Sequence, residues 1–79
     1  MNSWFLYTKK GCPYCDKAKK LLFNVGQYYI SKEVTEYNKA KIYSEIDHLT
    51  KTYRYFPIIF KNGKFLGGFK ELEEDIKLV

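Results

Sequence analysis

The spacing of apolar residues in the first half of the chain predicts a strand, a helix and a second strand. Residues 3–8 are apolar at nearly consecutive positions, which is typical of a central strand buried on both faces. From Pro13 to Val25 the apolar residues recur at the spacing of one helical face, and Gly26 suits the end of this helix. Residues 28–34 are rich in aromatic and β-branched side chains. Because a helix separates the two strands, we expect them to run parallel.

The second half predicts a helix, a hairpin and a closing helix. Apolar residues within 38–53 recur at helical spacing, and Asn38 is a candidate N-cap. The runs 55–60 and 65–66 flank Asn62-Gly63, which favours a tight antiparallel hairpin. Gly67-Gly68 ends the hairpin. The predicted helical stripes are Ala18, Leu21, Leu22 and Val25, then Ile42, Ile46, Leu49 and Tyr53, then Phe69, Leu72, Ile76 and Val79. We therefore predict one α/β domain over residues 1–79 with the order βαβαββα.

The only two cysteines, Cys12 and Cys15, lie where the first strand meets the first helix. Strand, C-x-x-C and helix in that order are typical of thioredoxin-like redox sites. The reactive form of cysteine is the thiolate, which the start of a helix favours, and Pro13 suits the first helical position. Residues 9–20 also contain five lysines and one aspartate, a local charge of +4. We interpret Cys12 as the nucleophile and Cys15 as the resolving thiol.

Structural roles for the cysteine pair are weaker alternatives. A disulfide across three residues closes a very small loop and adds little stability. A structural zinc site needs four ligands, and the rest of the chain offers only His48 as a further nitrogen or sulfur ligand. His48 lies off the apolar stripe of its helix and is expected to be exposed. We therefore expect no metal.

Composition and net charge limit the classes of function that the chain can serve. With 46% hydrophobic residues and 15 aromatic side chains, the 79 residues can form a core. The net charge of +5 invites a nucleic-acid hypothesis, but the lysines are spread along the chain and Arg54 is the only arginine. A positive surface that attracts an anionic thiol or an acidic protein is simpler. We expect a cytoplasmic monomer that binds neither nucleic acid nor membranes.

With these parts placed, the chain resembles a dithiol glutaredoxin of the Cys-Pro-Tyr-Cys type, in the thioredoxin-fold superfamily. The matching pieces are Tyr7-Thr8-Lys9 before Cys12-Pro13-Tyr14-Cys15, then Phe56-Pro57 and Gly67-Gly68. The resemblance implies a four-stranded mixed sheet in the order 2-1-3-4, flanked by three helices. It also implies reduction of glutathione mixed disulfides and protein disulfides, with glutathione as electron donor.

The resemblance further implies a set of glutathione contacts. The proline at position 57 would be cis and lie beside the nucleophile, and the backbone of Phe56 would meet the cysteinyl part of glutathione. Lys9 and Arg54 would meet the glycine carboxylate, and Lys70 and Glu71 the γ-glutamyl end. The implied glutathione-binding residues are Lys9, Tyr14, Arg54, Phe56, Pro57, Gly68, Lys70 and Glu71. Glutaredoxins usually have Thr-Val before this proline, so Tyr55-Phe56 makes a bulkier wall. They also usually have a hydroxyl residue and Asp where Lys70 and Glu71 stand.

Two further functions remain open at this point. One is a glutaredoxin-like redoxin that is reduced by thioredoxin reductase and donates hydrogen to ribonucleotide reductase. Gly68-Phe69-Lys70 resembles the Gly-Phe-Arg run of that group, whereas Pro13-Tyr14 argues against it. The other is a glutathione-dependent iron–sulfur cluster carrier, which Pro13 disfavours because cluster-binding members tend to have Gly or Ser there. Protein partners would be disulfide-containing or glutathionylated proteins.

Overall fold

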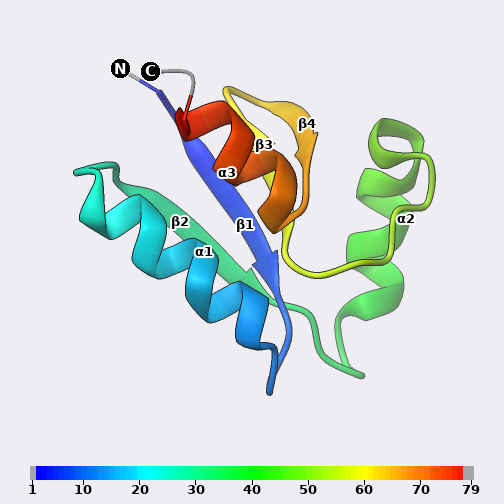
Figure 1. Ribbon diagram of the computed structural model, residues 1–79. Coiled ribbons are helices and arrows are strands. Elements are labelled where there is room, and N and C mark those ends of the chain that lie inside the picture. The colour runs from blue at the N-terminus through cyan, green and yellow to red at the C-terminus, as the bar shows by residue number, and fades with distance from the viewer. Residues whose placement is uncertain (1, 78–79) are drawn as a thin grey trace.

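Three helices pack around a four-stranded sheet in the computed structural model, which describes residues 2–77 (Figure 1). The elements are β1 Trp4–Thr8, α1 Pro13–Asn24, β2 Tyr29–Glu33, α2 Lys39–Thr50, β3 Ile58–Lys61, β4 Lys64–Gly67 and α3 Phe69–Lys77. The strand order is β2-β1-β3-β4, with β2 parallel to β1 and the other two pairs antiparallel. This confirms the predicted thioredoxin-like order and mixed sheet.

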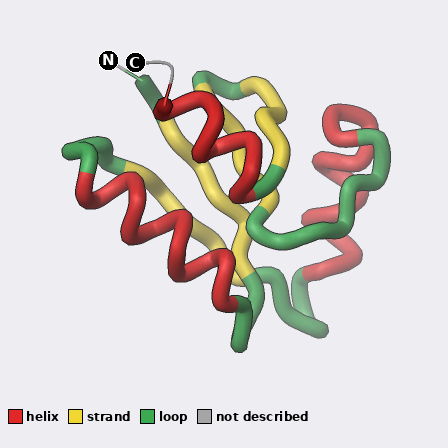
Figure 2. Tube along the Cα trace, in the orientation of Figure 1, coloured by secondary structure: helices red, strands yellow, loops and turns green. Residues whose placement is uncertain are grey.

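The two faces of the sheet are covered by different helices (Figure 2). Helices α1 and α3 cover one face, where the core residues are Trp4, Leu6, Ala18, Leu22, Ile59 and Leu72. Helix α2 covers the other face, where they are Val34, Ile42, Ile46, Ile58 and Phe60. Within residues 2–77, no helix is both long and apolar enough to cross a bilayer.

Burial along β1 differs from the prediction. The strand begins at Trp4, and only alternate residues are buried: Trp4, Leu6 and Thr8 on one face, with Phe5 and Tyr7 half-buried on the other. A hollow of about 350 Å³ between this second face and α2 leaves those rings partly open. A helix of 12 residues is too short to cover the whole face. The expected burial on both faces was therefore wrong.

Helix α1 ends as its sequence predicts. Gly26 has φ +75°, and the N–H groups of Gly26 and Gln27 donate to the carbonyl oxygens of Phe23 and Leu22. This is the Schellman arrangement, which favours glycine because its left-handed conformation costs other residues energy. The apolar stripe is shorter than predicted, because Val25 lies past the helix and is exposed.

Helix α2 corrects two predictions. The side chain of Asn38 does not cap the helix; it accepts a hydrogen bond from the Thr35 N–H and donates one to the Glu33 carbonyl. Asn38 thus holds the turn between β2 and α2. The helix also stops at Thr50, because Lys51 and Thr52 both adopt left-handed φ angles of 55° and 58°. Leu49 is consequently exposed, as is His48.

The hairpin and the last helix follow the predicted pattern, but the third strand is shorter than predicted and the fourth, Lys64–Gly67, is longer. Asn62 and Gly63 have φ angles of 54° and 78°, as a type I′ turn requires. Strand β3 begins at Ile58 and not at residue 55, since Pro57 has no N–H to donate to a strand ladder. Helix α3 begins at Phe69 as predicted. Val79, the last predicted member of its stripe, lies outside the described residues.

Candidate active site

Cys12 is the N-cap of α1, and its backbone is extended with φ −105° and ψ 104°. Its Sγ accepts a hydrogen bond from the Cys15 N–H at 3.2 Å, and its carbonyl oxygen accepts from the N–H groups of Cys15 and Asp16. Pro13 occupies the start of the helix, as predicted. Cys12 Sγ therefore lies beside an N–H donor at the positive end of the helix dipole.

Cys15 has the opposite environment. Only 2% of its surface is exposed, whereas Cys12 is half-buried, and both cysteines are free thiols. Burial, followed by the hydrogen bond and charge of Cys12, raises the pKa of the Cys15 thiol to about 12, although a backbone hydrogen bond from Lys9 and the charge of Lys19 act in the opposite direction. The two sulfurs therefore differ in the way that the sequence predicts: one is accessible and the other is an inward-facing thiol that keeps its proton at neutral pH.

The loop before β3 approaches the same sulfur. The Phe56–Pro57 peptide bond is cis, which confirms the prediction made for this proline. The carbonyl oxygen of Phe56 lies 3.7 Å from Cys12 Sγ, and Pro57 is buried behind it. The backbone of Phe56 thus faces the position where a disulfide substrate must approach Cys12.

A groove of about 600 Å³ lies between this loop, α1 and the start of α3. It is lined by Tyr14, Lys17, Tyr53, Tyr55, Phe56, Gly68, Phe69, Lys70, Glu71 and Glu73. Five of these were predicted as site residues: Tyr14, Phe56, Gly68, Lys70 and Glu71. Tyr55 was expected at the groove wall, although not as a binding residue. The other four were missed, because Tyr53 and Phe69 were assigned to core stripes and no motif marked Lys17 and Glu73. The run of aromatic residues before Pro57 was the available signal for Tyr53.

Gly68 lines the groove, and Gly67 precedes it at the end of β4. The Gly68 N–H donates to Glu71 Oε1 at 2.7 Å, and the Gly68 carbonyl accepts from the Leu72 N–H at 3.1 Å. Glu71 therefore caps the start of α3 through its side chain. A Cβ on Gly67 would lie 2.6 Å from the Glu71 side chain, and one on Gly68 would lie 2.7 Å from the Tyr53 hydroxyl. A side chain larger than that of glycine would therefore meet a neighbouring residue at either position.

Lys9 does not line this groove; it lines a neighbouring hollow. Its Nζ is 5.9 Å from the centroid of the Phe56 ring. Lys9, Phe56, Lys39 and Tyr43 are among the residues that line a second hollow of about 230 Å³. Phe56 thus borders both spaces, and Lys9 is an exposed cation next to it.

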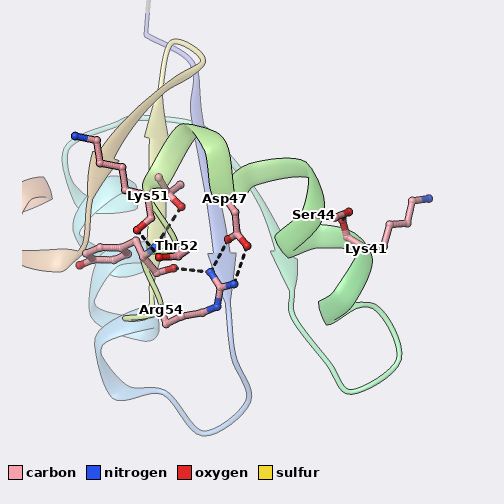
Figure 3. A network of polar contacts seen from close by, with 8 residues as sticks. Lys41, Ser44, Asp47, Lys51, Thr52 and Arg54 are labelled. Atoms are coloured by element: carbon pink, nitrogen blue, oxygen red, sulfur yellow. Dashed lines mark hydrogen bonds and ion pairs between the residues drawn. The ribbon is translucent and has the colours of Figure 1, made fainter.

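Arg54 pairs with Asp47 of α2 (Figure 3). Its guanidinium donates to both carboxylate oxygens of Asp47, at 2.7 and 3.0 Å, and stacks 3.6 Å from the centroid of the Tyr43 ring. The hydrogen bond from Arg54 lowers the pKa of the Asp47 carboxyl, and the same bond raises the pKa of Arg54. Arg54 therefore does not line the groove, but the Tyr43 ring on which it stacks borders the hollow next to Lys9 and Phe56.

Within residues 2–77, no three His, Cys, Asp or Glu side chains come close enough together to hold a metal ion. The site is thus a dithiol at a helix start, beside an aromatic groove, and its chemistry is suited to thiol–disulfide exchange.

Comparison with known proteins agrees with this geometry. The glutaredoxin family profile matches residues 5–66. "Glutaredoxin-2, mitochondrial" of Mus musculus is 30% identical over 67 residues, which cover 85% of this chain and 43% of the mouse protein. The chain thus spans less than half the length of that relative.

Solved structures show the same fold. A dithiolic glutaredoxin from Trypanosoma brucei brucei aligns with a TM-score of 0.82 and 31% identity, covering 98% of this chain and 79% of that one. A buckwheat glutaredoxin–glutathione complex aligns with a TM-score of 0.82 and 28% identity, covering 96% of this chain and 69% of that one. On the family match, the shared fold and the dithiol at the start of α1, this chain belongs to the glutaredoxin family.

Proposed function

We propose that this protein is a thiol–disulfide oxidoreductase that reduces glutathione mixed disulfides and protein disulfides, with glutathione as electron donor. The observation that carries the proposal is the difference between the two cysteines. Cys12 is accessible at a helix start and receives an N–H donor, whereas Cys15 is buried and holds its proton. A reactive thiolate next to a reserve thiol is what two-step disulfide reduction requires.

For a glutathione mixed disulfide, the reaction needs only Cys12. Its thiolate attacks the glutathione sulfur, the substrate–glutathione S–S bond breaks, and the substrate leaves as a thiolate that takes up a proton. A second glutathione thiolate then attacks the sulfur of glutathione bonded to Cys12. This step forms oxidised glutathione and restores the Cys12 thiolate.

For a protein disulfide, Cys15 completes the reaction. Attack by Cys12 forms a mixed disulfide with the substrate, and Cys15 then attacks Cys12 Sγ and releases the reduced substrate. Once Cys12 is bonded to the substrate, it no longer raises the Cys15 pKa through its charge and hydrogen bond. Burial still raises this pKa. Without the two contributions from Cys12, however, the Cys15 thiol loses its proton more easily, as its attack on Cys12 Sγ requires.

Several features of the groove support glutathione as the donor. A buckwheat relative of the same fold has been solved as a complex with glutathione. Here the Phe56 carbonyl lies next to Cys12, and Lys70 and Glu71 border the start of α3. Glu71 uses Oε1 for the Gly68 N–H, so its other oxygen is the one we assign to the γ-glutamyl ammonium. We assign the glycine carboxylate to Lys9, which is exposed beside Phe56.

Two single substitutions test the division of labour. With glutathione and glutathione reductase as electron source, Cys12→Ser should abolish turnover of both a glutathione mixed disulfide and a protein disulfide. Cys15→Ser should retain turnover of the mixed disulfide and lose most of the protein disulfide activity. Residual activity in Cys12→Ser would contradict the nucleophile assignment, and equal losses of both activities in Cys15→Ser would contradict the resolving role.

A further inference from the structure

The groove beside the dithiol exposes a large aromatic surface. Tyr14 is 55% exposed and Tyr55 is 75% exposed, although both line the groove next to Cys12 and Phe56. Large aromatic side chains usually bury much of their surface, so two open rings at one site require an explanation. Tyr55 and Phe56 follow one another in the chain and both line this groove.

These rings are held in place by neighbours. The rings of Tyr14 and Phe69 are 5.7 Å apart, and Lys17 Nζ lies 5.0 Å from the Tyr14 ring. On the loop before β3, the Tyr53 ring packs edge-on against Tyr55 at 5.5 Å and against Phe65 at 5.0 Å. The aromatic surface is therefore largely preformed, which lowers the entropy cost of binding a ligand against it.

The charged side chains that line the groove sum to no net charge. Its lining contains two lysines and two glutamates: Lys17, Lys70, Glu71 and Glu73. One oxygen of Glu71 already accepts the Gly68 N–H. Five of the ten lining residues are aromatic, and this favours an aromatic group against the Tyr14 and Tyr55 rings.

We propose that this groove receives an aromatic side chain of the substrate protein, next to the cysteine that becomes bonded to Cys12, and that Tyr55 sets this preference. The inference rests on the proposed dithiol chemistry and adds its substrate class: disulfides flanked by Phe, Tyr or Trp. In the step concerned, Cys12 breaks the substrate S–S bond and forms a mixed disulfide. Cys15 then forms the Cys12–Cys15 disulfide and releases two substrate thiols, so two electrons pass from the protein to the substrate.

The test uses the reduced protein and two cyclic disulfide peptides that differ only in Phe or Ala beside one cysteine. Single-turnover rates need no glutathione, so the choice of electron donor does not affect the result. We expect the Phe peptide to react roughly two- to tenfold faster, the range that a favourable aromatic contact provides. In Tyr55→Ala this ratio should fall close to one, and in Tyr55→Phe it should persist.

Tyr37→Ala is the matched control, because Tyr37 is fully exposed and does not line the groove. It should keep the wild-type ratio. Equal rates for the two peptides with the wild-type protein, or an unchanged ratio in Tyr55→Ala, would overturn the inference while leaving the dithiol function intact. Failure of either peptide to oxidise the wild-type protein would instead contradict the proposed function, and the inference with it.

Discussion

Cys12 Sγ lies 3.7 Å from the carbonyl oxygen of Phe56, a residue 44 positions later in the chain. This contact joins the start of α1 to the loop that precedes β3. The same loop carries Tyr53 and Tyr55, so the position of the reactive sulfur and the shape of the groove depend on one segment. Any change that moves this loop should therefore alter chemistry and binding together.

The burial of Cys15 predicts an unusual pH dependence of its reactivity. In Cys12→Ser, burial, the largest cause of the raised pKa, remains. An acid with a raised pKa keeps its proton to higher pH, so the reactive thiolate of Cys15 should be scarce until the solution is strongly alkaline. Its alkylation by iodoacetamide should reach half its maximal rate well above pH ~8.5, the value for an ordinary cysteine. A midpoint at or below that pH would contradict the buried environment.

Gly67 should tolerate alanine poorly. Its φ of 136° is rare for other residues, and a Cβ there would lie 2.6 Å from the side chain of Glu71. We expect Gly67→Ala to lower the free energy of unfolding by about 1–3 kcal/mol, measured by urea denaturation. Gly63→Ala is the control: its φ is 78°, but a Cβ there would meet no atom within 4 Å. An equal effect of the two substitutions would show that the contact with Glu71 is unimportant.

Lys9 and Arg54 should contribute unequally to glutathione binding. Lys9 is exposed beside Phe56, whereas Arg54 is held by Asp47 and Tyr43. Lys9→Ala should raise the KM for glutathione by roughly two- to fivefold, as expected for an exposed charge pair. Arg54→Ala should change this KM less and should instead raise the pKa of Asp47, which NMR titration measures. A larger increase in KM for Arg54→Ala would mean that Arg54 leaves Asp47 to bind glutathione.

Much of the fold could be predicted because local signals agree with the global arrangement. The helical spacing after Pro13, the Asn62-Gly63 turn and Gly26 each specify a conformation with few alternatives. The errors concern burial. Leu49 and Val25 lie on predicted apolar stripes yet are exposed, because short helices on a small sheet cannot cover every residue of such a stripe.

The part of the site that a local motif forms could be predicted from the sequence. The part formed by segments far apart in the chain was harder to predict. The motif Cys12-Pro13-Tyr14-Cys15 fixed the helix start and the inequality of the two sulfurs. Tyr53 shows the limit of periodicity: its spacing indicated a core residue, but α2 ends before it, and its ring borders the groove. The pairing of Arg54 with Asp47 needs the turn at residues 51 and 52, whose left-handed backbone no sequence pattern marked.

The most direct test of the account is the turnover of a small glutathione mixed disulfide with each of two electron sources. One assay supplies glutathione and glutathione reductase, and the other supplies thioredoxin reductase without glutathione. We predict turnover with glutathione, because a groove of about 600 Å³ stays open between Tyr55, Phe56 and the start of α3. Turnover with thioredoxin reductase alone would contradict glutathione as the donor and would favour the redoxin alternative.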